Sequence, residues 1–185
     1  MKQTISLDIK CLAPDINIDF LKQYTPLIET CHKVLHKKEG AGNQFLGWLE
    51  PTQMISGEEV EKIAKEAERL RKISEAMVVI GIGGSYLGAK AILDAMSSQI
   101  QATRKIYFAG YQLSASYHHH LLKEISTKEI CLNVISKSGG TIEPAVAFRI
   151  FKKALEEKYG HHSSIERIVA RSEERRVGKE CRSRW

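Results

Sequence analysis

The sequence predicts an α/β fold with a doubly wound parallel sheet in three α/β/α layers, preceded by two N-terminal helices. A short, continuous apolar run such as residues 77–80 is typical of a strand that is covered on both faces, and residues 130–135 form a second, largely apolar strand segment. Such strand segments alternate with longer segments in which apolar residues recur at helical spacing. Because such alternation places helices on both faces of a parallel sheet, ligands are expected beyond the carboxyl ends of the strands.

The beginning of the chain is expected to be helical. Apolar residues recur at helical spacing over residues 16–38, and Pro26 is expected to kink or divide this helix. Residues 40–53 are expected to form a loop with one buried aromatic anchor, either Phe45 or Trp48.

A further helix is predicted to begin after Ser56. Ser56 and Glu59 have the spacing of a capping box, in which each side chain accepts a hydrogen bond from the other residue's backbone N–H. One face of this helix carries Val60, Ile63, Ala64, Ala67, Leu70 and Ile73. We therefore assign residues 1–74 to a helical segment that packs on an α/β domain formed by residues 75–170.

Strands and helices alternate in order along this domain. Strands are expected at residues 77–80, 105–109, 130–135 and 165–170, and helices at residues 85–98, 114–125 and 143–158. His118–His120 lie on the middle helix, where three adjacent side chains cannot all reach one metal ion, so we expect no metal site there. His161 and His162 follow Gly160 and are expected in a loop.

Two turns at strand ends carry the chemistry of a phosphate site. Residues 81–88 form a glycine-rich turn that contains Ser85, and residues 136–141 form a turn rich in hydroxyl groups that opens a helix. Backbone N–H groups at a helix N-terminus, together with hydroxyl and ammonium groups, bind phosphate well. The expected phosphate-binding residues are Gly84, Ser85, Ser136, Lys137, Ser138 and Thr141.

Each turn also has a purely structural explanation. The glycines in residues 81–88 permit a tight strand-to-helix turn, and Ser138 or Thr141 can act as an ordinary helix N-cap. The Lys137 side chain can equally face solvent. A dinucleotide site is disfavoured, because the third glycine of the G-x-G-x-x-G pattern is replaced by Tyr86. A Walker motif is excluded, since no Gly-Lys-Ser or Gly-Lys-Thr sequence follows the glycines.

Composition excludes several other classes of protein. The chain has 185 residues, of which 43% are hydrophobic and 27% are charged, as in an ordinary globular domain. It has no apolar run long enough for a membrane span and no secretory signal, so we expect a cytoplasmic protein. The cysteines show no CxxC spacing and are expected to be reduced; they are Cys11, Cys31, Cys131 and Cys181.

The last 15 residues, Arg171–Trp185, differ from the rest of the chain. They contain six basic and three acidic residues and therefore account for half of the formal net charge of +6. A basic tail of this kind can bind nucleic acid. However, RSEERRVGKECRSRW resembles the translation of a sequencing adapter, so we treat it as a non-native tail and expect no nucleic-acid or membrane partner.

Two segments resemble a known family. VVIGIGGSYLGAKA (residues 78–91) and VISKSGGTIEPAVAFRIFKKALEEKYG (residues 134–160) resemble the first sugar-isomerase (SIS) domain of the bacterial glucose-6-phosphate isomerase family. The resemblance extends over residues 1–170. It implies that the phosphate of a sugar phosphate binds to the turn residues named above, with Lys137 contributing largely its backbone. In this chain Gly140 stands where the family has a threonine.

The resemblance also implies a reaction. Family members interconvert glucose 6-phosphate and fructose 6-phosphate, in glycolysis and gluconeogenesis, through a cis-enediol intermediate. They need no cofactor and act as homodimers. The family's catalytic arginine, glutamate, histidine and lysine lie beyond the matched segment, so we expect this chain to be truncated and inactive. Two alternatives are a non-catalytic SIS domain that binds sugar phosphates in a regulator, and an isomerase domain linked to an aminotransferase.

Overall fold

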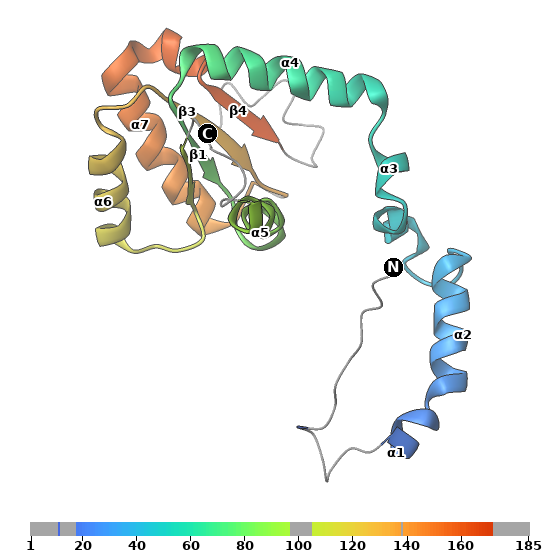
Figure 1. Cartoon of the computed structure of the whole chain (residues 1–185). Helices are drawn as coiled ribbons and strands as arrows, with labels where there is room; N and C mark the ends of the chain where they lie inside the picture. The colour runs from blue at the N-terminus through green and yellow to red at the C-terminus, as the bar shows by residue number, and fades with distance from the viewer. Residues whose placement is uncertain (1–10, 12–17, 97–104, 138, 172–185) are drawn as a thin grey trace. The chain divides into compact units, whose positions relative to one another are not determined.

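The computed structural model describes residue 11 and residues 18–96, 105–137 and 139–171. The chain divides into two compact units, Met1–Lys62 and Ile63–Trp185 (Figure 1). The boundary between these units falls within one helix, α4 (Gly57–Ile73). The units are therefore described one at a time.

The first unit is helical. It contains α1 (Ile18–Lys22), α2 (Thr25–His36), the 3₁₀-helix η2 (Asn43–Leu49) and α3 (Pro51–Met54). Pro26 lies in the first turn of α2, which confirms the division predicted there. The prediction of a buried anchor is wrong, because Phe45 is 72% exposed and Trp48 is 60% exposed. None of the described residues of this unit is buried, so the unit has no core that could cover either ring.

The start of α4 confirms the predicted capping box. The Ser56 N–H donates to Glu59 Oε2 over 3.2 Å, and the Glu59 N–H donates to Ser56 Oγ over 3.2 Å. Of the predicted apolar face, Leu70 is buried, whereas Val60 and Ile63 are exposed. Burial of this face is thus confined to the end of the helix that leads into the sheet.

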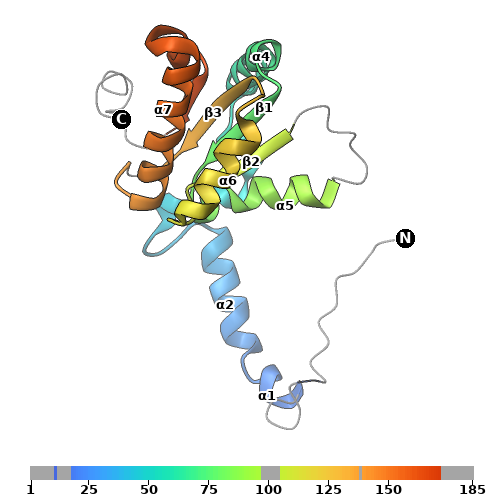
Figure 2. The same cartoon turned by 90° about the vertical axis from the view of Figure 1, so that its left-hand side faces the viewer.

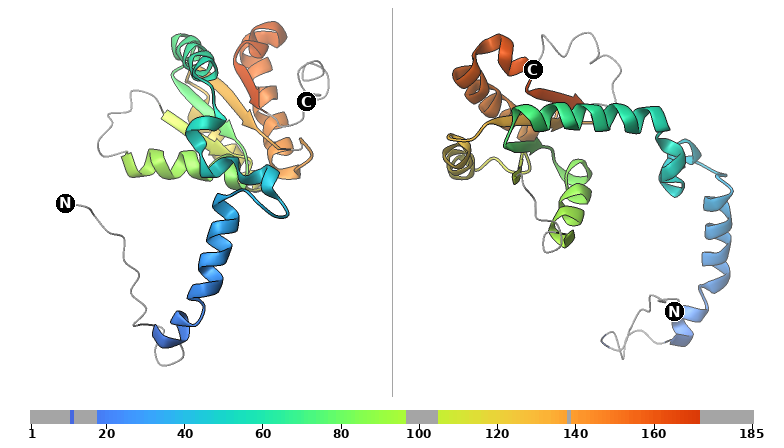
Figure 3. Two further views of the ribbon diagram at one scale, coloured as in Figure 1. Left: turned by 90° about the vertical axis from the view of Figure 1, so that its right-hand side faces the viewer. Right: turned by 45° about the horizontal axis from the view of Figure 1, so that its top comes forward.

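The second unit is built on a parallel four-stranded sheet, as the sequence predicted. Its strands lie in the order β2-β1-β3-β4 (Figures 1 and 3). All three pairs are parallel, and Ile80 at the end of β1 pairs with Ala109 of β2 and with Val134 of β3. The strands are β1 (Ala76–Ile80), β2 (Lys105–Ala109), β3 (Ile130–Ile135) and β4 (Ile168–Arg171).

Helices α6 (Ala115–Ile125) and α7 (Ile142–Ile165) cover one face of this sheet (Figure 2). Ser114 caps α6 by accepting a hydrogen bond from the Tyr117 N–H. The core between these helices and the sheet contains Val78, Ile80, Leu132, Val134, Leu121, Ile125, Ala147, Phe148, Phe151 and Leu155. Alternate strand residues such as Val79 and Cys131 are buried on the opposite face, so both faces of the sheet are covered.

Helix α7 is longer than the sequence predicted. It breaks at Gly160, whose φ of 79° and ψ of 164° are accessible essentially to glycine alone, and then resumes as far as Ile165. The prediction that His161 and His162 lie in a loop is therefore wrong. Because the helix resumes, β4 begins at Ile168 rather than at Ile165, and it extends to Arg171.

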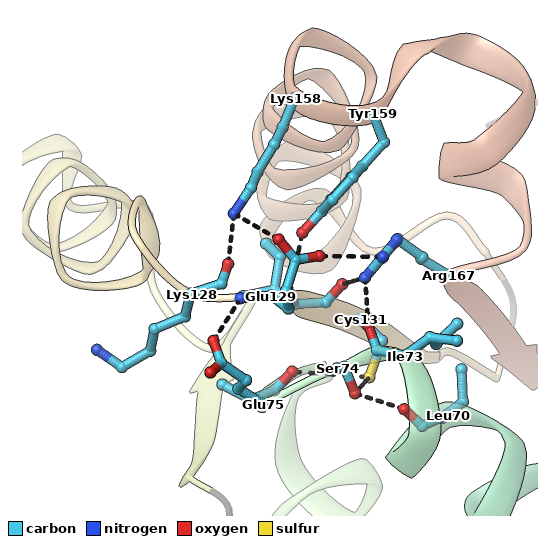
Figure 4. A network of polar contacts seen from close by, with 12 residues as sticks. Leu70, Ile73, Ser74, Glu75, Lys128, Glu129, Cys131, Lys158, Tyr159 and Arg167 are labelled. Atoms are coloured by element: carbon cyan, nitrogen blue, oxygen red, sulfur yellow. Dashed lines mark hydrogen bonds and ion pairs between the residues drawn. The ribbon is translucent and has the colours of Figure 1, made fainter.

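Arg167 joins several elements at the amino edge of the sheet (Figure 4). Its side chain is only 15% exposed. One guanidinium nitrogen donates to the carbonyl oxygens of Ile73, over 2.7 Å, and of Ile130, over 3.2 Å. The other terminal nitrogen lies 3.0 Å from Glu129 Oε2. The guanidinium carbon lies 3.9 Å from the centre of the Tyr159 ring, which completes a contact between α4, β3 and α7.

Glu129 makes stability depend on pH. Burial acts to raise the pKa of Glu129, but the Tyr159 hydroxyl and the charges of Lys158 and Arg167 outweigh it and hold this pKa below its usual value. A carboxylate with a lowered folded-state pKa stabilises the fold above its unfolded pKa of about 4.3 and loses that effect as pH falls through the folded-state pKa. We therefore expect Glu129→Gln to remove part of the loss of stability below about pH 4.3, as measured by urea unfolding at several pH values. An unchanged pH profile would contradict this expectation.

Candidate phosphate site

The carboxyl ends of three strands meet at one edge of the sheet. Because Ile80 pairs with both Ala109 and Val134, the turns that follow β1, β2 and β3 begin side by side. The Gly81 N–H donates to the Ala109 carbonyl over 3.0 Å, and the Ser136 N–H donates to the Arg171 carbonyl over 3.1 Å. The two turns predicted to bind phosphate therefore start from the same edge.

The glycine-rich turn forms a short 3₁₀-helix, η3 (Gly83–Ser85), so that α5 (Leu87–Met96) begins two residues later than predicted. The Ser85 N–H donates to the Ile82 carbonyl over 3.1 Å, and the Tyr86 N–H donates to the Gly83 carbonyl over 3.2 Å. These two amides are thus used within the turn. Gly84 is exposed, and Ser85 is half-buried.

Gly81 is the point at which the two turns approach each other. A Cβ atom at Gly81 would lie 3.0 Å from Ser85 Cβ and 3.3 Å from the Ile135 carbonyl oxygen. Ser85 and the peptide that leads into Ser136 therefore pack against the same glycine from different turns. This arrangement brings Ser85 next to the beginning of the hydroxyl-rich turn.

The hydroxyl-rich turn is folded around Ser136, which is 7% exposed. Ser136 Oγ accepts a hydrogen bond from the Gly139 N–H over 3.0 Å, and the φ of 68° at Gly139 favours glycine. Lys137 is exposed, and Ser138 lies outside the described residues. Because a hydroxyl can accept and donate at the same time, Ser136 keeps a proton to donate to a ligand.

Thr141 occupies the N-cap position of α7. Its φ of −71° and ψ of 129° are those of an extended residue, and its carbonyl accepts a hydrogen bond from the Ala145 N–H over 3.2 Å. The Thr141 hydroxyl makes no capping hydrogen bond within the described helix. Thr141 is therefore the N-cap residue, but its hydroxyl does not cap the helix. The Thr141 hydroxyl lies at the positive end of the α7 dipole, which favours a bound anion.

Sequence reasoning missed Gly110, where the third strand end joins this arrangement. Gly110 has a φ of 84°, and a Cβ atom there would lie 2.9 Å from Ile80 Cγ2, 3.1 Å from Pro144 Cα and 3.2 Å from the Gly81 nitrogen. It follows β2 directly, as Gly81 follows β1. A glycine directly after a strand was therefore the sequence signal that could have identified Gly110. Gly110 thereby allows the turn after β2 to pack closely against both the first turn of α7 and the start of the turn after β1.

The three adjacent histidines of α6 differ in burial. His118 is buried, and its Nδ1 lies 2.8 Å from the Ser114 carbonyl oxygen, whereas His119 and His120 are exposed. No cluster of potential metal ligands occurs among the described residues.

No described helix has the length and apolar character needed to cross a membrane. Cys11 and Cys31 are exposed, Cys131 is buried, and Cys181 lies outside the described residues.

The chain is similar in sequence to several glucose-6-phosphate isomerases. The enzyme of Clostridium novyi (strain NT) is 42% identical over 178 residues, which are 92% of this chain and 40% of that protein. The enzyme of Staphylococcus epidermidis is 45% identical over 153 residues, which are 81% of this chain and 34% of that protein. The chain therefore spans about 40% or less of the length of these relatives. No protein-family model matches it.

Two solved structures are similar to this chain. A hypothetical protein from Thermus thermophilus is 25% identical, with a TM-score of 0.64 over 83% of this chain and 35% of that one. A glucose-6-phosphate isomerase from Chlamydia trachomatis is 32% identical, with a TM-score of 0.55 over 63% of this chain and 23% of that one. This chain is therefore a homologue of the glucose-6-phosphate isomerases that corresponds to part of their length.

Proposed function

We propose that the carboxyl edge of the sheet binds the phosphate group of glucose 6-phosphate and fructose 6-phosphate, and that the whole protein interconverts these sugars as a homodimer. The observation that carries the proposal is the approach of Ser85 and the peptide before Ser136 to one glycine, Gly81. The names of the relatives support the substrate class.

The chemistry of the edge suits a phosphate dianion. The Ser85 and Thr141 hydroxyls can each donate to a phosphate oxygen, and Ser136 can do so while it accepts from Gly139. The N-terminus of α7 adds partial positive charge, and Lys137 adds an ammonium group from an exposed position. Hydrogen bonds to a charged acceptor are stronger than neutral ones, so a few of them suffice for binding.

Phosphate binding alone does not isomerise a sugar. The reaction moves a proton between C1 and C2, which requires a base near those atoms and a group that stabilises the enediol charge. The family resemblance assigns these roles to residues beyond the matched segment. We therefore propose that these 185 residues bind the sugar phosphate without converting it. Isomerase activity of the longer protein would separate this function from that of a non-catalytic regulatory domain, which would bind the same ligands without turnover.

Calorimetry with 6-phosphogluconate tests the site directly, and gluconate serves as the matched ligand without phosphate. We expect saturable binding of 6-phosphogluconate only. Replacing both Ser85 and Ser136 by alanine is expected to weaken binding by about a hundredfold or more, because each of the two lost hydrogen bonds to a charged group costs about 1.5–3 kcal/mol.

Ser126→Ala provides the control for this experiment. Ser126 follows the end of α6, at the amino edge of the sheet, and its hydroxyl donates to the Lys123 carbonyl over 2.8 Å. This variant should bind 6-phosphogluconate as the unaltered chain does. Equal affinity of the double variant and the unaltered chain would refute the assigned site, as would equal binding of gluconate.

A further inference from the structure

A group of aromatic rings adjoins the glycine-rich turn. Tyr86 directly follows Ser85, and its ring stacks on that of Tyr111, with centroids 5.2 Å apart and an interplanar angle of 18°. Tyr86 also contacts Phe108 of β2, with centroids 5.8 Å apart. All three aromatic residues are half-buried. The residue after Ser85 is thus held between the end of β2 and the turn that follows it.

These rings are themselves fixed to the fold. Tyr111 meets Tyr117 of α6 edge to face, with centroids 5.6 Å apart. The Tyr117 hydroxyl donates to the Phe108 carbonyl, and the Tyr117 N–H donates to Ser114 Oγ over 3.3 Å. Burial first, and then the neighbouring Tyr111 hydroxyl, raise the pKa of Tyr117, which therefore stays a neutral donor. Tyr111 consequently rests on a rigid support.

The glycine-rich turn depends on the aromatic rings for support, because the helix that follows it provides little. No residue of α5, the helix that follows the turn, is buried, so this helix does not fix the turn by packing on the sheet. A glycine at position 81 leaves room for Ser85 but provides no side chain to hold it. The stack between Tyr86 and Tyr111 supplies a contact of the required kind, because aromatic pairs favour a defined geometry.

We infer that Tyr111 is a positioning residue for the phosphate site: its ring holds Tyr86, and thereby the Ser85 hydroxyl, at the carboxyl edge of the sheet. This inference rests on the proposed function for its ligand. Loss of the ring should free the turn and weaken phosphate binding about three- to tenfold, in line with the strength of an aromatic pair. Loss of the hydroxyl alone should have little effect.

The test compares Tyr111→Ala with Tyr111→Phe in the full 185-residue chain. Amide hydrogen exchange at Ser85 and Tyr86 reports on the turn, because both N–H groups donate within it. Leu132, whose N–H donates to the Arg167 carbonyl over 2.8 Å, reports on the sheet. We expect the alanine variant to speed exchange at Ser85 and Tyr86 but not at Leu132. The phenylalanine variant should match the unaltered chain in exchange and in 6-phosphogluconate affinity.

Three results would overturn the inference. These are unchanged exchange at Ser85 and Tyr86 in Tyr111→Ala, equal acceleration at Leu132, and equal losses in the alanine and phenylalanine variants. If the unaltered chain bound no 6-phosphogluconate, the proposed function would fail and the role in phosphate binding would fail with it. If the unaltered chain binds 6-phosphogluconate but exchange at Ser85 and Tyr86 is unchanged in Tyr111→Ala, only the positioning role of Tyr111 is refuted.

Discussion

Replacing Gly110 by alanine is expected to lower the free energy of unfolding by about 3–5 kcal/mol and to weaken phosphate binding. A side chain at a φ of 84° is strained, and the new Cβ would lie 3.1 Å from Pro144 Cα and 3.2 Å from the Gly81 nitrogen. Both are backbone atoms, so neither can rotate away. Relief requires that α7 or the turn after β1 move, and those segments carry the candidate site. Urea unfolding and calorimetry measure the two effects.

Gly160→Ala is the matched control for this variant. Gly160 belongs to the same unit and has a φ of 79°, but apart from its chain neighbours and the nearby helix backbone no described atom lies within 4 Å of the Cβ position. Its replacement therefore adds backbone strain without a clash, at a cost of about 1–3 kcal/mol. Binding of 6-phosphogluconate should be unchanged, because Gly160 lies near the C-terminal end of α7. Equal losses of stability and affinity in the two variants would contradict the role given to close packing at Gly110.

Replacing Arg167 by alanine is expected to lower the free energy of unfolding by about 2–4 kcal/mol. The change leaves the carbonyl oxygens of Ile73 and Ile130 without this donor, since the Arg167 guanidinium bonds to both. It also removes the ion pair with Glu129 and the contact with the Tyr159 ring. Thermal unfolding followed by circular dichroism measures the loss.

Two further variants show whether geometry or charge is responsible. Arg167→Lys keeps the charge but lacks the planar group that reaches several partners at once, so its loss should fall between those of the unaltered chain and the alanine variant. Arg69→Ala removes an ion pair with Glu66 whose two side chains are 43% and 41% exposed. Its cost should be less than about 1 kcal/mol. A loss at Arg167 no greater than that at Arg69 would show that the buried network contributes little.

Strands were predictable wherever a short apolar run stands between clear boundaries. The observed ranges of β2 and β3 are those predicted, because polar or glycine residues enclose each run. The start of β4 was misplaced, because Ile165 was assigned to the strand although it ends a resumed helix, and Glu166 and Arg167 separate it from Ile168. Whether a glycine ends a helix or only breaks it depends on the packing of the following residues, which is not visible in the sequence.

The candidate site was predictable as far as its determinants are local. Ser85 and Thr141 could be proposed as site residues because glycine and hydroxyl groups follow apolar strands within a few residues. Gly110 and Tyr111 were missed because their importance depends on β2 lying next to β1, and strand order is a property of the whole sheet. Either Phe45 or Trp48 was expected to be a buried anchor, but burial requires a core that the described residues of this unit do not supply.

All four strands run in the same direction, and this polarity separates two tasks in space. The ion pair and the hydrogen bonds of Arg167 secure one rim of the sheet, whereas the turns after β1 and β3 form the opposite rim. Changes confined to one rim can therefore alter the proposed phosphate site without touching the contacts of Arg167. Variant libraries drawn from the loops after β1 and β3 should retain a larger share of folded members than libraries of equal size drawn from the residues around Arg167.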